Sequence, residues 1–209
     1  MKIQWIGHAS FRFDLNDGRS IVTDPFDPAV GYDLPARPAD IVTMSHGHHD
    51  HNYIGSLAPK TVVREAGVFE ESGLRVEGIP SFHDDMHGAK RGTNVIFVFE
   101  ADGARVAHLG DLGHDLTDED IARLGKLDVL MIPVGGVFTI DAKQAAALAK
   151  RVGAKITVPM HFTTDRLSFQ LGGVDAFLDA MGVSHETADA IDPKETHAPV
   201  VVMNYGKGL

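Results

Sequence analysis

The chain has 209 residues, and 29 acidic against 19 basic side chains give it a formal net charge of −10. It contains no cysteine, which excludes disulfides, thiolate metal ligands and a cysteine nucleophile. It has no basic run of the kind that follows a phosphate backbone, and its longest apolar run is far too short to cross a bilayer. We therefore expect neither nucleic acid nor a membrane as a partner.

The sequence reads as one domain over residues 1–209, because no linker, low-complexity tract or short-period repeat interrupts it. Its first residues show no signal-peptide pattern, from which we expect a cytoplasmic protein. A homo-oligomer is left open, since the sequence does not specify the oligomeric state.

The first half of the chain is predicted to consist of short strands joined by turns. We expect strands at residues 2–6, 11–15, 20–23, 40–44, 61–64, 74–78, 94–100 and 105–109. Asn16-Asp17-Gly18 and Ala101-Asp102-Gly103-Ala104 are typical of hairpin turns. A short helix is expected from Asp50 to Leu57.

The second half adds helices between strands. We expect helices at residues 117–124, 141–151 and 174–181, and strands at 128–133, 155–159 and 199–203. Thr117 and Asp141 are predicted N-caps, and Gln144 completes a capping box with Asp141. This order favours a mixed α/β or α+β domain in which helices enclose two sheets.

The segment Ser45-His46-Gly47-His48-His49-Asp50-His51 follows a buried strand. His46 and His48 are two residues apart, and that spacing at a strand end points both side chains the same way. With Asp50 and His51, four ligand-type side chains converge within six residues. Imidazole and carboxylate are ligands that zinc accepts, so the segment predicts a metal site.

Three more ligand-type residues follow predicted strands, namely His83, Asp111 and His161. Functional sites are commonly built where strands enter loops. Each of these residues alone is a weak signal, because a lone histidine at a strand end is more often an ordinary polar side chain.

The ordered pattern resembles the metallo-β-lactamase superfamily. It comprises His-x-His-x-Asp-His, a later His, Gly-Asp and a last His. Further segments are similar to a small prokaryotic branch that includes L-ascorbate-6-phosphate lactonase-like proteins: Trp5-Ile6-Gly7-His8-Ala9-Ser10-Phe11, Thr23-Asp24-Pro25, Leu109-Gly110-Asp111 and Ile132-Pro133-Val134-Gly135-Gly136. The resemblance implies a four-layer αββα sandwich with two metals at one edge.

The resemblance also implies the ligand sets. His46, His48 and His83 would bind the first metal, whereas Asp50, His51 and His161 would bind the second. Asp111 would bridge the two. We expect zinc, with manganese, iron and nickel as alternatives.

Two metals roughly 3.5–4 Å apart can share a water and lower its pKa, and the resulting hydroxide would attack a carbonyl carbon or a phosphorus. We therefore expect a hydrolase of a small ester, lactone, thioester or phosphoester. Asp50 would bind metal and orient the hydroxide.

Four further residues are candidates with an ordinary alternative each. Asp24 would accept the free N–H of a ligand histidine and so fix its tautomer, or simply form a turn before Pro25. His8 would face the substrate, also as a proton donor, or be a loop histidine. Arg91 would bind an anionic substrate group, and His114 would line the cleft, or both would be ordinary surface residues.

Two other functions compete with this hypothesis. The first is a nucleotide phosphodiesterase or nuclease, against which the acidic charge and the lack of a long insertion speak. The second is a di-iron redox or non-hydrolytic metal-binding protein. His48 speaks against it, because the di-iron relatives carry Glu at that position.

Overall fold

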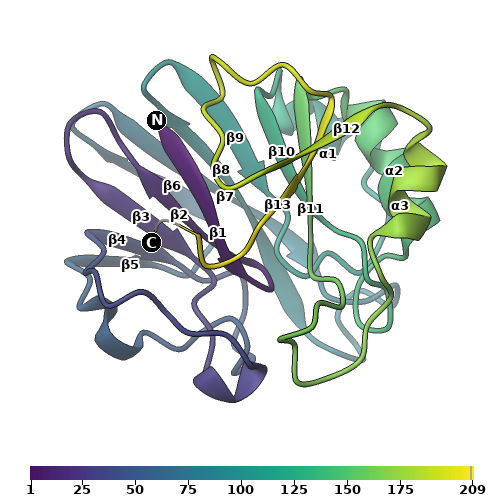
Figure 1. Cartoon of the computed structure of the whole chain (residues 1–209), viewed down its shortest axis with the longest axis horizontal. Helices are drawn as coiled ribbons and strands as arrows, with labels where there is room; N and C mark the ends of the chain where they lie inside the picture. The colour runs from purple at the N-terminus through teal and green to yellow at the C-terminus, as the bar shows by residue number, and fades with distance from the viewer. Residues whose placement is uncertain (208) are drawn as a thin grey trace.

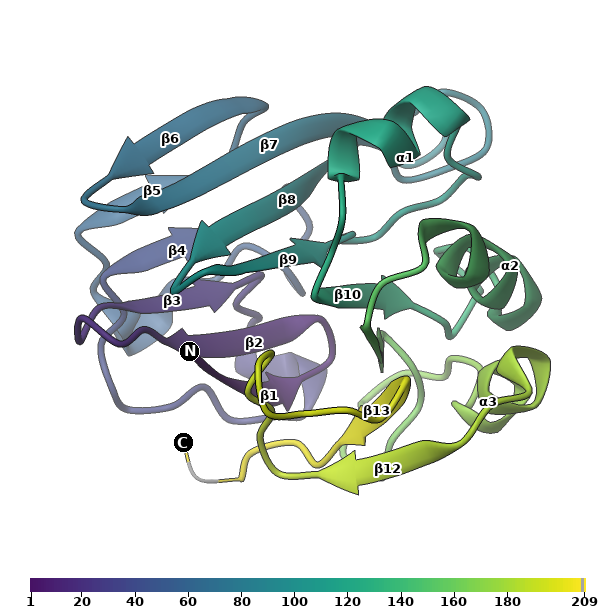
Figure 2. The same ribbon diagram turned by 90° about the horizontal axis from the view of Figure 1, so that it is seen from above.

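The strands form two sheets that lie against each other (Figures 1 and 2). The computed structural model describes residues 1–207 and 209. The smaller sheet has the order β1 (Lys2–Gly7), β2 (Ser10–Asp14), β3 (Ser20–Thr23), β4 (Ile41–Thr43) and β5 (Thr61–Val63). The larger sheet has the order β12 (His185–Ala188), β13 (Val200–Met203), β11 (Ile156–Met160), β10 (Val129–Pro133), β9 (Ala104–His108), β8 (Thr93–Ala101), β7 (Leu74–Phe82) and β6 (Gly67–Glu71).

The main hydrophobic core lies between the sheets. Alternate residues of β2 and β8 point inward, and Phe13 meets Phe99 edge to face with ring centroids 5.0 Å apart. Trp5 stacks near Phe11 in the same core. This burial of large aromatic side chains is the main force that holds one sheet on the other.

Three α-helices cover the outer face of the larger sheet (Figure 2). They are α1 (Asp118–Leu124), α2 (Ala142–Val152) and α3 (Asp175–Met181), which confirms the three predicted helices within one residue at each end. Thr117 and Asp141 are the N-caps as predicted, and Oε1 of Gln144 accepts the backbone N–H of Asp141 to complete the capping box. The capping satisfies backbone N–H groups that the first helical turn leaves free.

The outer face of the smaller sheet is covered differently. A second apolar cluster includes Val22, Phe26 and Val42, and it is closed by loops with two short 3₁₀ turns, Pro28–Val30 and Gly55–Leu57. The predicted helix from Asp50 to Leu57 is therefore wrong, apart from its last turn. Tyr53 donates its backbone N–H across to Pro25, and Gly55 has a positive φ of 53°, so the chain leaves the helical path.

The expected two-sheet α/β sandwich is thus confirmed, with α-helices on one side of it. The sequence interpretation missed the two edge strands of the larger sheet, β6 and β12, because most of their side chains are exposed and show no apolar alternation. Among the described residues, we find no helix with the length and apolar character needed to span a membrane.

Strand direction decides where a site can form. The pairs β3/β4 and β4/β5 are parallel, as are β9/β10 and β10/β11. The carboxyl ends of these strands therefore meet at one edge of the sandwich, where loops from both sheets come together. At that edge the backbone N–H of His161 donates to the carbonyl of His8 at 3.1 Å.

Candidate metal centre

Every predicted metal-binding residue follows a strand at this edge of the sandwich. The segment 46–51 follows β4, His83 follows β7, Asp111 follows β9, and His161 follows β11. The structure brings all seven predicted ligands into one cluster.

The cluster divides into groups whose potential ligand atoms lie within 4.8 Å of one another. His46, His48 and His83 form one group. Asp50, His51 and His161 form another, and His8 joins it. These two groups match the ligand sets that the resemblance implies, except for the addition of His8, while a further group of His46, His51 and Asp111 joins them.

Asp111 lies between the two groups. Its Oδ2 atom is 3.3 Å from Nε2 of His83, and 3.2 Å from Nε2 of His161. The same oxygen is 3.2 Å from Nε2 of His51. Asn94 fixes this carboxylate from the side, because its Oδ1 accepts the backbone N–H of Asp111 at 3.0 Å.

Glycine is required beside Asp111. Gly110 has a φ of 56°, and a Cβ there would come within 2.6 Å of Cβ of Ser45. A side chain at position 110 would therefore push apart β9 and the histidine segment.

Buried Asp24 fixes the histidine segment by accepting hydrogen bonds from it. Its Oδ1 accepts the backbone N–H of Ser45 at 2.7 Å, while its Oδ2 accepts the Ser45 hydroxyl at 2.5 Å and Nδ1 of His51 at 2.9 Å. Ser45 has only one hydroxyl hydrogen, so its Oγ must accept from Nδ1 of His46 at 2.9 Å. Both histidines are thereby held in the tautomer that leaves the Nε2 lone pair free.

The freed nitrogens fit a bound cation. Within the described part of the chain, Nε2 of His46, His51 and His161 are buried without a hydrogen-bond partner, and so is Oδ1 of Asp111. Buried polar atoms without partners are rare in folded proteins, and metal ions satisfy such atoms. The donor set of imidazole and carboxylate therefore fits a divalent metal.

The electrostatics of the cluster also favour a cation. Burial alone would lower the pKa of His51, but Asp111, Asp24 and Asp50 hold that pKa well above its usual range. Burial alone would raise the pKa of Asp111, but His161 and His51 keep it well below its usual range. The carboxylates thus favour a positive charge between them, which a bound metal would supply.

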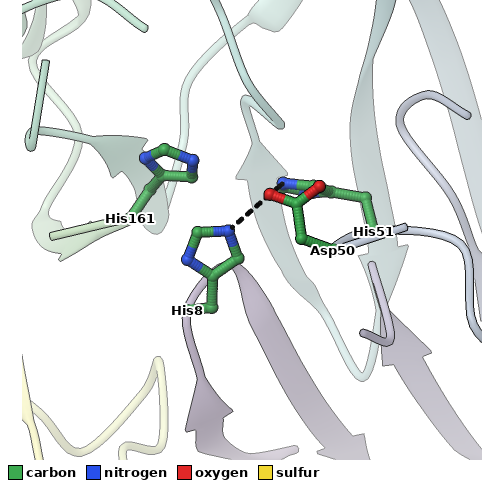
Figure 3. A group of neighbouring side chains, drawn as sticks. All are labelled: His8, Asp50, His51 and His161. Carbon is green, nitrogen blue, oxygen red and sulfur yellow. Dashed lines mark hydrogen bonds and ion pairs between the residues drawn. The ribbon is translucent and has the colours of Figure 1, made fainter. Parts of the chain in front are cut away.

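His8 sits inside the second group rather than at its rim (Figure 3). Its Nε2 is 3.2 Å from Oδ2 of Asp50, and its ring centroid is 4.3 Å from that of His161. Burial, followed by the nearby His161, lowers the pKa of His8 to about 4. A histidine that is neutral near pH 7 does not favour the proton-donor role that the sequence suggested, whereas its contact favours orientation of Asp50.

The backbone is strained at this edge. His8, Asp24 and His161 all have positive φ, at 52°, 40° and 53°. Non-glycine residues rarely adopt this conformation, and it tends to persist at functional sites where surrounding contacts enforce it.

A cavity of about 400 Å³ opens over the cluster. Its lining residues are His48, His49, Asp50, His83, Arg91, Asp111, Phe138 and Phe169. Arg91 is therefore at the position that a substrate-binding residue needs. The sequence interpretation missed His49, Phe138 and Phe169; the two phenylalanines lie on loops that no motif marks, so no signal was available for them.

His114 is absent from the described lining of this cavity. Its Nε2 accepts the backbone N–H of Phe82 at 3.2 Å, and its Nδ1 donates to the carbonyl of Asp115 at 2.8 Å. Both ring nitrogens are hydrogen-bonded to backbone atoms, so the surroundings of His114 do not support the predicted substrate contact.

A larger cavity of about 590 Å³ lies behind β1 and is lined by aromatic residues that include Trp5, Tyr32 and Tyr205. None of its described lining residues belongs to the His/Asp cluster. We therefore place the chemistry in the smaller cavity.

Comparison with known proteins agrees with this geometry. The family model for the beta-lactamase superfamily domain matches residues 2–161. A UPF0173 metal-dependent hydrolase from Methanoculleus marisnigri is 36% identical over 188 residues, which cover 78% of this chain and 82% of that protein. Another from Methanoregula boonei is 32% identical over 188 residues, which cover 78% of this chain and 83% of that protein.

Solved structures show the same fold. A protein from Thermotoga maritima, provisionally described as a Zn-dependent hydrolase of the metallo-beta-lactamase superfamily, superposes with a TM-score of 0.80 at 39% identity over 97% of both chains. Igni18, a metallo hydrolase from Ignicoccus hospitalis, has a TM-score of 0.67 at 21% identity, over 99% of this chain and 96% of that one, and shows likeness of fold alone. The chain belongs to the metallo-β-lactamase superfamily, among its UPF0173 metal-dependent hydrolases.

Proposed function

We propose that the chain binds two divalent metal ions, zinc before manganese, iron or nickel, and hydrolyses a small ester, lactone, thioester or phosphoester. One observation carries the proposal: Oδ2 of Asp111 lies at 3.2–3.3 Å from imidazole nitrogens of both ligand groups. A single carboxylate placed between two sets of free imidazole nitrogens suits two ions better than one.

His46, His48 and His83 would hold the first ion, and Asp50, His51 and His161 would hold the second. Asp111 would contact both. When bound, such a pair of ions polarises the scissile group and lowers the pKa of water. Asp24 and Ser45 contribute by fixing the rings of His51 and His46 before any metal arrives.

Asp50 is the residue of the second group that reaches the cavity, with a side chain that is 14% exposed while those of His8 and His51 are fully buried. Burial alone would raise the pKa of Asp50, but the nearby His51 and the hydrogen bond with His8 keep that pKa below its usual range. Asp50 thus stays ionised, and its carboxylate can accept a hydrogen bond from the attacking water and orient it.

No protein nucleophile is needed for this reaction. The described lining of the cavity contains no Ser, Thr or Cys side chain. A volume of about 400 Å³ is the size of a small-molecule site. We therefore propose a small molecule as the substrate.

The test combines metal analysis with a panel of a chromogenic ester, a lactone, a thioester and a phosphodiester. Asp50→Asn is compared with the matched control Asp179→Asn, which changes an exposed carboxylate on α3. We expect hydrolysis of at least one panel member, and loss of at least about a hundredfold in turnover for Asp50→Asn, since acid–base groups contribute about 10²–10⁴-fold. Full activity of metal-loaded Asp50→Asn, or a metal-loaded wild type that hydrolyses nothing, would contradict the proposal.

A further inference from the structure

We infer that the substrate of this site carries a carboxylate group and an apolar arm, the first bound by Arg91 and the second by Phe138 and Phe169. The inference rests on the proposed function, because these three residues line the same cavity as His83 and Asp111. It concerns which hydrolysable molecule the site selects.

Arg91 is a cation without an acidic neighbour. Within the described residues, no carboxylate lies within ion-pair distance of its guanidinium, although the whole chain carries a net charge of −10. Its Nη2 donates to the carbonyl of Val137 at 3.3 Å, and its guanidinium carbon lies 5.3 Å from the ring centroid of Phe138. The remaining N–H groups form a planar fork that matches the two oxygens of a carboxylate.

The number of charges favours a carboxylate over a phosphate monoester. Arg91 is the one Lys or Arg side chain in the described lining of the cavity. A single guanidinium balances one negative charge, whereas a phosphate monoester carries nearly two near neutral pH. Apart from the ions that the proposed function places on the His/Asp cluster, the cavity wall therefore offers the charge to bind one monoanionic group.

The position of Arg91 is set in advance by Asp84. This buried carboxylate accepts four backbone N–H groups, from Met86 at 2.8 Å, Gly88 at 2.9 Å, Lys90 at 2.9 Å and Arg91 at 2.7 Å. Asp84 directly follows His83, so the loop that carries Arg91 is fastened beside the metal cluster. With its backbone fixed by Asp84 and its guanidinium bonded to Val137, Arg91 loses less conformational entropy when it binds a ligand.

The apolar wall faces the same cavity. Phe138 is 39% exposed, and its ring centroid lies 6.3 Å from that of half-buried Phe169. Phe169 also lies against His8, with ring centroids 5.5 Å apart. Two aromatic rings at the mouth of a polar cluster offer a surface for an alkyl or aryl group.

A strained turn carries Phe138, one of the two residues of the apolar wall. The backbone N–H of Phe138 donates to the carbonyl of Gly136 at 2.7 Å, and the central residue, Val137, has a φ of 64°. This is the rare, strained form of the γ-turn, and a β-branched residue is especially unsuited to it. The turn nevertheless places both the carbonyl that holds Arg91 and the Phe138 ring at the cavity, which is why we assign it to ligand binding.

The experiment measures binding to the zinc-loaded protein by calorimetry, with 4-phenylbutyrate and its neutral analogue 4-phenylbutanol. We expect the carboxylate to bind more tightly, and Arg91→Gln to weaken its binding about tenfold or more while it changes alcohol binding less than about twofold, as for loss of a charged hydrogen bond. Phe138→Ala should weaken both ligands. The control Arg37→Gln, at an exposed arginine outside the cavity, should change neither.

Equal binding of the two ligands, or an Arg91→Gln protein with unchanged preference, would overturn the inference. Tighter, Arg91-dependent binding of phenylphosphonate would also overturn it in favour of a phosphate-like substrate. The result is separable from the proposed function. An active hydrolase without charge preference contradicts only the inference, whereas a protein that shows the binding pattern but hydrolyses no ester supports the inference and contradicts the function.

Discussion

Oδ2 of Asp24 lies 2.9 Å from Nδ1 of His51, and both side chains are fully buried. Asp24 follows β3 and His51 lies beyond β4, so this contact joins two parallel strands at the edge that carries the cluster. It sets the tautomer of His51 and turns its Nε2 towards Asp111.

Replacement of Asp24 by Asn should weaken metal binding. An amide has one acceptor oxygen, so it cannot accept both the Ser45 backbone N–H at one position and the Ser45 hydroxyl with His51 at the other. We therefore expect metal affinity to fall about 10–100-fold, as for other groups that support metal ligands. We expect thermal stability to fall as well, because a buried donor loses its acceptor. Competition with a chromogenic chelator measures the affinity.

The control for this change is Asp27→Asn. Asp27 caps the turn Pro28–Val30 through the N–H of Ala29, and Asn caps equally well. Both affinity and stability should therefore be kept. Unchanged metal affinity in Asp24→Asn would show that the contact with His51 has no part in metal binding.

Asp84 should act as a positioning residue for Arg91. In Asp84→Asn, one amide group replaces a carboxylate oxygen that accepts from Lys90 and Arg91, and the loop should loosen. We expect a loss of the preference for 4-phenylbutyrate over 4-phenylbutanol close to that of Arg91→Gln, with metal content kept.

The neighbouring Asp85→Asn serves as the matched control, because exposed Asp85 binds only the Lys90 ammonium among the described contacts. It should keep the preference. If Asp84→Asn kept the carboxylate preference while its stability fell, Asp84 would be a purely structural residue.

Tyr205 gives a pH dependence that is independent of the metal cluster. Its phenol donates to Asp165 at 2.5 Å, and this bond, followed by burial, raises the pKa of Tyr205 to about 12 from 10.0. The folded state therefore favours the protonated phenol. Its contribution to stability is present below pH 10.0 and is lost as the pH rises through about 12.

The ultraviolet absorbance of tyrosinate measures this titration, and Tyr205→Phe assigns the signal. Asp165→Asn should return the pKa towards 10.0, because the amide removes the negative charge beside the phenol. Titration of Tyr205 at its ordinary pKa in the wild type would show that the contact with Asp165 does not form in solution.

Removal of metal should destabilise the fold. Without a cation, the carboxylates of Asp50 and Asp111 lie beside imidazole Nε2 atoms that have no hydrogen-bond partner among the described residues, those of His46, His51 and His161. A ligand at about a thousandfold over its Kd stabilises by about 4 kcal/mol, and each kcal/mol shifts Tm by about 2–4 °C for a chain of this size, so a chelator should lower Tm by about 10 °C. Differential scanning calorimetry checks this, and zinc should restore the original Tm. An identical Tm in chelator would contradict it.

Sequence reasoning located the cluster because each of its predicted ligands lies in the loop that follows a strand. The motif from His46 to His51 is recognisable by itself. The parallel strands β9, β10 and β11 bring Asp111 and His161 to the same edge. His83 ends there too, because β7 and β9 are both antiparallel to β8. Asp24 was predicted behind a ligand His, and the structure shows its contact with His51.

Other features depend on tertiary contacts that no local pattern contains. His8 belongs to the second ligand group only because β1 lies close to the end of β11. Phe138 and Phe169 meet across loops more than thirty residues apart. The segment 50–57 has helix-compatible residues, yet Tyr53 bonds to Pro25 instead, and tertiary pairing overrides local propensity.

The stoichiometry of tightly bound metal tests the central claim most directly. Elemental analysis after saturation with zinc and removal of excess metal should give two equivalents per chain for the wild type. It should give one for His83→Ala and one for His161→Ala, since each change removes a ligand of a different group. A wild type that retains one equivalent or none, or a His83→Ala and a His161→Ala protein that both retain two, would contradict the account.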